Sequence, residues 1–137
     1  MIPVTQVWEC LYFGGRDDAE HLFRSNPFGI TTVISVCEVK VLRHNPSINY
    51  VHVAIADATP VTVGQFDAII DAIAENIRWG KVLVHCGSGV SRSPIVTAAW
   101  MHVVGYKNID AALAEVKRLR PIISPSPTLL KSVKELL

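Results

Sequence analysis

Five residues separate a cysteine from an arginine in the segment His85-Cys86-Gly87-Ser88-Gly89-Val90-Ser91-Arg92-Ser93. Glycines such as Gly87 and Gly89 permit backbone conformations in which successive N–H groups point into one concavity. A helix predicted to begin near Arg92 adds further free N–H groups and the positive end of its dipole. This environment suits a phosphate-sized anion and favours the thiolate form of Cys86, which is the nucleophilic form.

The two residues at the end of this segment have matching chemistry. Arg92 carries a planar guanidinium that can hold two oxygens of a phosphate group. Ser93 places a hydroxyl where it can donate a hydrogen bond to a departing thiolate. A cysteine alone at the end of a strand is more often a core residue, and a glycine-rich loop alone is a common anion site. The combination therefore favours covalent catalysis on a phosphate ester.

The elements that must position this loop alternate between strands and helices. Short β-branched runs predict one or two strands within residues 4–13 and further strands at 33–36, 50–55 and 82–84. Apolar periodicity, capping residues and Gly or Pro stops predict helices over 17–25, 62–80, 92–104, 108–121 and 126–137. The expected fold is α/β, with a central, largely parallel twisted sheet of about five strands flanked by helices. In such a sheet the site lies at the carboxyl ends of the strands.

Composition limits the classes of function that remain. A length of 137 residues predicts one domain over 1–137, and 50% hydrophobic residues exclude intrinsic disorder. The net charge of +1 gives no general field for nucleic acid or a membrane surface. Three cysteines without Cys-x-x-Cys spacing indicate neither a disulfide framework nor a metal site. No signal peptide or membrane span is visible, so we expect a cytoplasmic monomer without cofactor.

The segment 85–93 resembles the His-Cys-x5-Arg-Ser/Thr motif of cysteine-dependent protein tyrosine phosphatases, and residues 89–93 are most similar to the dual-specificity branch. The resemblance extends to 11–14, 29–34 and 120–130. It implies that the chain hydrolyses phosphate esters on proteins through a phosphocysteine intermediate, without a metal.

The resemblance also implies a role for each residue of the loop. Cys86 would be the nucleophile and Arg92 the phosphate clamp, while Ser93 would assist breakdown of the intermediate. His85 would order the loop and keep the cysteine in its thiolate form. The phosphate cradle would be the backbone of Gly87, Ser88, Gly89, Val90 and Ser91.

This mechanism needs a general acid for the leaving oxygen, and Asp57 is the best candidate. The family takes this acid from a loop roughly thirty residues before the nucleophile, and Asp57 precedes Cys86 by 29 residues. The alternative is an Asp that only forms a turn in Ala-Asp-Ala-Thr-Pro. Asp67 and Asp71 are rivals by sequence distance, but their spacing indicates the solvated face of a helix.

Two residues that follow the predicted strand 33–36 are candidates for supporting roles. Glu38 would pair with Arg92 and hold its guanidinium, or it is an ordinary loop carboxylate. By resemblance, Cys37 would form a disulfide with oxidised Cys86, or it is a small buried apolar residue. One departure from the family is Ser126 after Pro125, where members often have Asn, and this puts a supporting hydrogen bond in doubt.

The side chains of the loop limit the substrate. None of the variable positions is basic, which weakens a phosphoinositide or an RNA 5′-phosphate as substrate. A site with few insertions around it is shallow, and it admits phosphoserine and phosphothreonine as well as phosphotyrosine. The alternatives left open are a catalytically silent module that docks phosphoproteins and a rhodanese-like sulfurtransferase.

Overall fold

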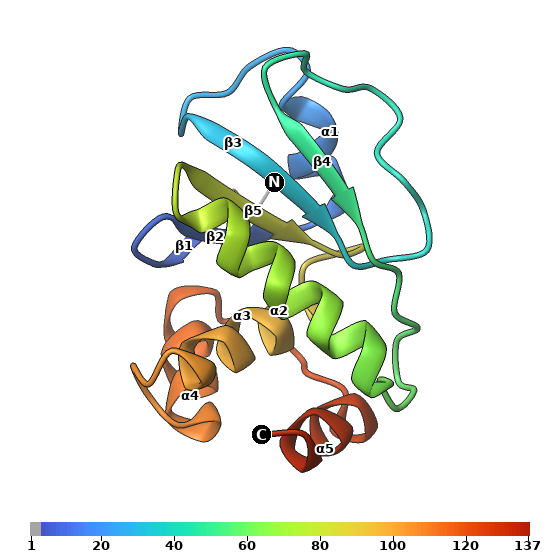
Figure 1. Ribbon diagram of the computed structural model, residues 1–137, viewed down its shortest axis with the longest axis vertical. Helices are drawn as coiled ribbons and strands as arrows, with labels where there is room; N and C mark the ends of the chain where they lie inside the picture. Colours follow the sequence, from blue (N-terminus) through green and yellow to red (C-terminus); the bar gives the residue numbers. More distant parts are fainter. Residues whose placement is uncertain (1–3) are drawn as a thin grey trace.

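The computed structural model describes residues 4–137 and contains one sheet with helices on both faces (Figure 1). Its strands are β1 (Thr5–Trp8), β2 (Leu11–Gly14), β3 (Ile30–Ser35), β4 (Asn49–His52) and β5 (Lys81–His85). Its helices are α1 (Arg16–His21), α2 (Val63–Ile77), α3 (Arg92–Val103), α4 (Ile109–Leu119) and α5 (Pro127–Glu135).

The sheet has five strands in the order β1-β2-β5-β3-β4. The hairpin partner β1 runs antiparallel to β2, and every other neighbouring pair is parallel. This confirms the predicted α/β fold with a largely parallel sheet. The strand β5 lies at the centre, and all of its residues after Lys81 are buried.

Alternation along the central strands builds a core on each face of the sheet. Val82 and Val84 of β5 belong to the larger cluster, which α2, α3, α4 and α5 cover. Leu83 points the other way, into a smaller cluster with Ala19 and Leu22 from the α1 segment. Figure 1 shows α2 crossing one face while α1 lies behind the sheet. Both faces of β5 are therefore dry, as expected for a parallel strand.

Three of the helices, α2, α4 and α5, begin where their capping residues predict. Thr62 accepts a hydrogen bond from the N–H of Gln65, whose side chain accepts one from the N–H of Thr62 in return. Asn108 and Ser126 cap α4 and α5 through their side chains. The helix predicted over 17–25 is shorter, since α1 ends at His21. No helix within residues 4–137 is long and apolar enough to cross a membrane.

The carboxyl ends of the parallel strands lie in one row across the sheet. Gly14 pairs in register with His85, His85 with Ser35, and Ser35 with His52. The strand predicted over 50–55 ends earlier, at His52. The loops that carry the predicted site residues all leave the sheet from this row, so chain positions far apart in sequence meet at one edge.

Candidate active site

The loop between β5 and α3 turns its carbonyl oxygens outward. The carbonyl of Gly87 accepts a hydrogen bond from the N–H of Arg16 at 2.8 Å, and that of Val90 accepts one from the N–H of Ser124 at 2.7 Å. In the described part of the chain, nothing accepts a hydrogen bond from the backbone N–H groups of residues 87–91. Together with the first turn of α3, these donors form a concavity suited to an anion.

Of the two glycines predicted to shape this loop, only Gly89 has an unusual conformation. Its φ is +74°, and a Cβ there would lie 2.7 Å from the carbonyl carbon of Gly14. Gly87 has no positive φ, and a Cβ there would meet only Arg92 Nη2, at an ordinary 3.6 Å. The expectation that both need glycine geometry is therefore wrong for Gly87. The short distance from this Cβ position to Arg92 Nη2 also shows that one end of the guanidinium faces the loop.

Cys86 lies at the floor of the concavity beside Ser93. The residue is 2% exposed, and its Sγ lies 3.3 Å from Ser93 Oγ. The Ser93 hydroxyl is within hydrogen-bond distance, 3.2 Å, of the Gly14 carbonyl oxygen. When Cys86 is a thiol, the Ser93 hydroxyl can donate its hydrogen bond to the Gly14 carbonyl oxygen. When Cys86 is a thiolate, the same hydroxyl can rotate and donate to the sulfur. Ser93 is thus placed to respond to the charge of Cys86.

His85 supports the loop from below as a neutral imidazole. Its Nδ1 lies 3.2 Å from the carbonyl oxygen of Cys86, which can only accept, so Nδ1 carries the proton. Nε2 then accepts from the hydroxyl of Ser35 at 2.6 Å. Burial lowers the pKa of His85, which favours this neutral form. The pair fixes the end of β5 against β3 directly before the cysteine.

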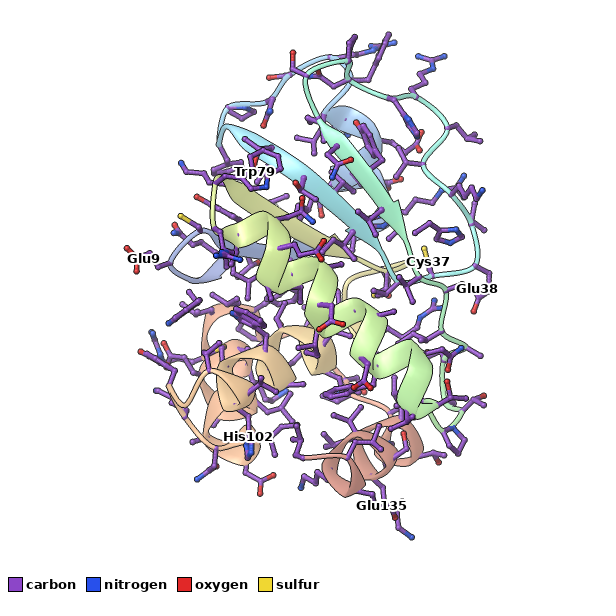
Figure 2. The ribbon with its side chains drawn as sticks, viewed as in Figure 1. Glu9, Cys37, Glu38, Trp79, His102 and Glu135 are labelled. Carbon is purple, nitrogen blue, oxygen red and sulfur yellow. The ribbon has the colours of Figure 1, made fainter. Side chains whose placement is uncertain are left out.

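Arg92 is held on the side away from the loop by an acidic residue and a carbonyl. Its Nη1 donates to Glu38 Oε1 at 2.9 Å and to the Ile55 carbonyl oxygen at 3.1 Å. A hydrogen bond from its own backbone N–H and the one from Arg92 lower the pKa of Glu38. Figure 2 shows Glu38 beside Cys37, beyond the end of β3. The structure thus brings Glu38 to Arg92.

Asp57 lies on the exposed segment between β4 and α2, and it reaches the loop through Ser91. Its Oδ1 accepts a hydrogen bond from Ser91 Oγ at 2.9 Å. The neighbouring Ala58 has a φ of +54°, and its N–H also donates to the Asp57 carboxylate. The rivals Asp67 and Asp71 lie exposed on α2, as their spacing predicts. Of the three, Asp57 is the one bonded to the cysteine loop.

The closing segment is bonded to the cysteine loop through the backbone of Ser126. The Ser126 N–H donates to Ser91 Oγ at 3.0 Å, while the Ser126 side chain caps α5 by accepting from the N–H of Leu129. The bond to Ser91 comes from the backbone and so does not depend on which side chain position 126 carries.

Cys37 is buried beside the site. Its Sγ donates to the carbonyl oxygen of Val39 at 3.3 Å. Burial raises the pKa of the Cys37 thiol, and the positive charge of Arg92 partly opposes that increase. All three cysteines are free thiols in this structure.

Arg120 is a supporting residue whose role its sequence context does not reveal. It is 3% exposed, and its guanidinium lies over the ring of Phe13, 5.4 Å from the centroid. It also reaches the carbonyl oxygen of Ser88 at 3.5 Å. Burial lowers the pKa of Arg120. The Arg-Pro pair at 120–121 belongs to the stretch quoted for the resemblance, but only the structure shows its contact with the loop.

Comparison with known proteins identifies the family of this chain. Residues 11–136 match the family described as "Dual specificity phosphatase, catalytic domain". The chain is 29% identical over 126 residues to dual specificity protein phosphatase 14 of Homo sapiens, and the match covers 90% of this chain and 63% of that protein. It is 32% identical over 127 residues to dual specificity protein phosphatase 18 of Rattus norvegicus, covering 90% of this chain and 61% of that protein. The chain thus spans less than two thirds of these relatives.

Solved structures show the same fold. The crystal structure of DUSP15 superposes with a TM-score of 0.86 at 29% identity, covering 98% of this chain and 86% of that one. The structure of human DUSP28(Y102H) gives a TM-score of 0.85 at 22% identity, covering 98% and 94%. The sheet and the cysteine loop define the cysteine-dependent phosphatase fold. Within that class, the chain belongs to the dual specificity phosphatase catalytic-domain family.

Proposed function

We propose that residues 1–137 form one catalytic domain that hydrolyses phosphate esters on proteins through a phosphocysteine intermediate. The observation that carries this proposal is the cysteine loop itself. Its N–H groups are unpaired within the described chain, its floor is the Cys86 sulfur, and Arg92 faces it from the first turn of α3. An anion of phosphate size would meet donors on every side with its phosphorus in front of the sulfur.

In the first step, the Cys86 thiolate attacks phosphorus along the line opposite the leaving oxygen. The P–S bond forms while the P–O bond to the substrate side chain breaks, and Asp57 gives its proton to the departing oxygen. The equatorial oxygens face the backbone N–H groups and Arg92. Glu38 and the Ile55 carbonyl fix the guanidinium before substrate arrives, which avoids reorganisation during the reaction.

In the second step, water attacks the phosphocysteine. Asp57, now a carboxylate, takes a proton from that water, and the P–S bond breaks to release inorganic phosphate. The electron pair returns to Cys86 as a thiolate. Ser93 Oγ, 3.3 Å from the sulfur, donates a hydrogen bond to the departing thiolate and so assists this step.

The polarity of the site supports a protein substrate carrying a single phosphate. The side chains between Cys86 and Arg92 are uncharged, and Arg120, which reaches the Ser88 carbonyl, is buried against Phe13. Within residues 87–93, a ligand with several phosphates would therefore find Arg92 as the one charged clamp. Gly87, Ser88 and Asp57 are exposed, which supports an open site that admits phosphoserine and phosphothreonine beside phosphotyrosine.

A second candidate is a phosphate-binding module without turnover. The donor-lined loop alone would support it, because binding needs neither Cys86 nor Asp57. The bond between Asp57 and Ser91 favours the enzyme, since it holds a carboxyl group at the rim of the loop, where an anion-binding module gains nothing from a second negative charge.

The test is phosphate release from matched phosphotyrosine and phosphothreonine peptides without added metal, with Cys86→Ser as the blank. We expect turnover of both by the wild type and none by the variant, which should still bind the phosphotyrosine peptide. Binding by the wild type without turnover would establish the docking module. If the wild type neither binds nor hydrolyses these peptides, the substrate is instead a phosphate ester that is not on a protein.

Asp57→Asn tests the general acid. We expect a loss of about 10²- to 10⁴-fold on a phosphothreonine peptide, the usual range for a proton-transfer group. An aryl ester such as p-nitrophenyl phosphate, whose leaving group needs little protonation, should lose far less. An equal loss on both substrates would remove Asp57 from the mechanism.

A further inference from the structure

Ser91 occupies the N-cap position of α3 but does not cap the helix. A serine there ordinarily accepts a hydrogen bond from an N–H of the first turn. Here the Ser91 side chain makes no such bond, and its backbone lies at φ −122° and ψ −68°. Its hydroxyl instead joins Asp57, on the segment after β4, to Ser126, at the start of α5.

The direction of both hydrogen bonds of the Ser91 hydroxyl is fixed. The backbone N–H of Ser126 can only donate, so Ser91 Oγ accepts from it at 3.0 Å. The single hydroxyl proton is then left for the carboxylate of Asp57, 2.9 Å away. Rotating the hydroxyl would give up a hydrogen bond to a charged group, which is among the stronger kinds in proteins.

This bond distinguishes the two oxygens of Asp57. Oδ1 accepts from Ser91 Oγ and from the N–H of Ala58, whereas Oδ2 accepts nothing in the described part of the chain. A carboxyl group whose Oδ1 is occupied by two donors carries its acidic proton on the other oxygen. Of the two bonds, the one from Ala58 is local, so within residues 4–137 Ser91 supplies the only side-chain hydrogen bond between Asp57 and the cysteine loop.

We propose that Ser91 is a positioning residue for the general acid: its hydroxyl fixes the Asp57 carboxyl at the rim of the loop and leaves Oδ2 as the oxygen that protonates the leaving group. This rests on the proposed function, in which Asp57 acts as the acid. The backbone N–H of Ser126 sets the direction of the Ser91 hydroxyl, so the start of α5 takes part in orienting the acid.

The test compares Ser91→Ala with Ser91→Thr, which keeps a hydroxyl, on a phosphothreonine peptide and on p-nitrophenyl phosphate. We expect Ser91→Ala to lower kcat on the peptide roughly 3- to 10-fold, the effect of one neutral hydrogen bond, because Asp57 is protonated when it acts as the acid. KM should change little, p-nitrophenyl phosphate should lose much less, and Ser91→Thr should recover most of the loss. An equal loss of kcat on both substrates, or no recovery by threonine, would overturn the assignment.

A double variant separates positioning of Asp57 from general damage. In an Asp57→Asn background, Ser91→Ala should lower kcat on the peptide no further, because the group that it orients is gone. An independent loss in the double variant would instead show that Ser91 acts on the loop itself. Thermal unfolding of each variant checks that the fold is intact.

The role of Ser91 can also be read without turnover, which keeps it distinct from the proposed function. The ¹³Cγ resonance of Asp57 should move in Ser91→Ala at neutral pH. It should stay in place in Ser132→Ala, which removes the hydroxyl that accepts from the N–H of Val61 at the far end of the same segment. An unchanged Asp57 resonance in Ser91→Ala would overturn the proposal, whereas an inactive wild type would count only against the proposed function.

Discussion

Gly89 is the position in the cysteine loop where a single methyl group should cost the most stability. Its φ is +74°, and a Cβ there would lie 2.7 Å from the carbonyl carbon of Gly14 and 2.9 Å from the N of Gly15. Both atoms are backbone at the junction between β2 and α1, so a flexible side chain cannot relieve the clash. Gly89→Ala should therefore push the loop away from the end of β2.

The magnitude has two parts. Placing an L-residue at a left-handed φ costs roughly 1–2 kcal/mol. Crowding against atoms that cannot move freely costs a further ~1–3 kcal/mol, as in overpacked cores. Gly89→Ala should therefore lower the free energy of unfolding by about 2–5 kcal/mol, a large share of the ~5–15 kcal/mol typical of a domain.

Two other glycines provide matched controls. Gly29 has a φ of +71° with nothing within 4 Å of a built Cβ, so Gly29→Ala should show the conformational cost alone, roughly 1–2 kcal/mol. Gly87 has no positive φ and an open Cβ position. Gly87→Ala should be neutral or stabilising by up to about 1 kcal/mol, because alanine restricts the unfolded chain.

Urea unfolding followed by fluorescence of Trp8, Trp79 and Trp100 measures all three variants in one assay. The expected order of destabilisation is Gly89→Ala, then Gly29→Ala, then Gly87→Ala. Equal losses for Gly89→Ala and Gly29→Ala would refute the close approach between the loop and the β2–α1 junction. A large loss for Gly87→Ala would refute the geometry assigned to the loop.

Three further perturbations test the surroundings of the cysteine. Glu38→Gln should lower kcat/KM about 2- to 5-fold, the effect of losing an exposed ion pair, and it should weaken inhibition by inorganic phosphate. An unchanged inhibition constant would show that Arg92 does not need Glu38 to bind phosphate. Because burial lowers the pKa of His85, the unfolded chain binds the extra proton, so stability should fall as pH drops below about 6.5. Between pH 7.5 and 5.5, the free energy of unfolding measured in urea should fall by up to about 1.4 kcal/mol more in the wild type than in His85→Gln. An identical pH dependence in the two proteins would contradict a buried neutral imidazole. Peroxide should convert Cys86 to a sulfenic acid, which the Cys37 thiol then attacks with loss of water to form a disulfide. The intact mass under non-reducing conditions should then fall by two hydrogens in the wild type but not in Cys37→Ser. The same mass change in both proteins would exclude the disulfide.

The order and type of the elements follow from local features of the sequence. Thr62, Asn108 and Ser126 each begin a helix as their side chains predict, because a cap depends only on neighbours within one turn. The ends of several elements differ from prediction, among them those of α1 and β4. The residues after His52 have strand-like composition, but Val53 and Ile55 donate to the carbonyls of Ser35 and Val36 while the chain already turns toward α2. Such endings depend on tertiary contacts.

The site divides in a similar way. Cys86 and Arg92 are recognisable because their chemistry is confined to a few consecutive residues. Asp57 could be predicted from its distance in sequence before Cys86, and Glu38 from its position after a predicted strand. The contacts of Ser91 and Arg120 link segments 32 or more residues apart, so no local pattern reports them. A serine before a helix even predicts the wrong partner for its hydroxyl.

The register of the parallel strands determines both how the core packs and where the site residues lie. Ser35 and His85 are partners across β3 and β5, and their side chains meet at 2.6 Å because they share a row and a face. A slip of β5 by one residue would set Val84 opposite Ser35 and turn every side chain of the strand to the other face. Such a slip would part the buried His85 from Ser35 and would exchange Leu83 with the smaller valines between the two clusters. The Ser35–His85 pair and the packing on both faces thus favour the register that sets Cys86 relative to Gly14 and Ser35, and a substitution deep in β5 should disturb the loop even where it touches none of its residues.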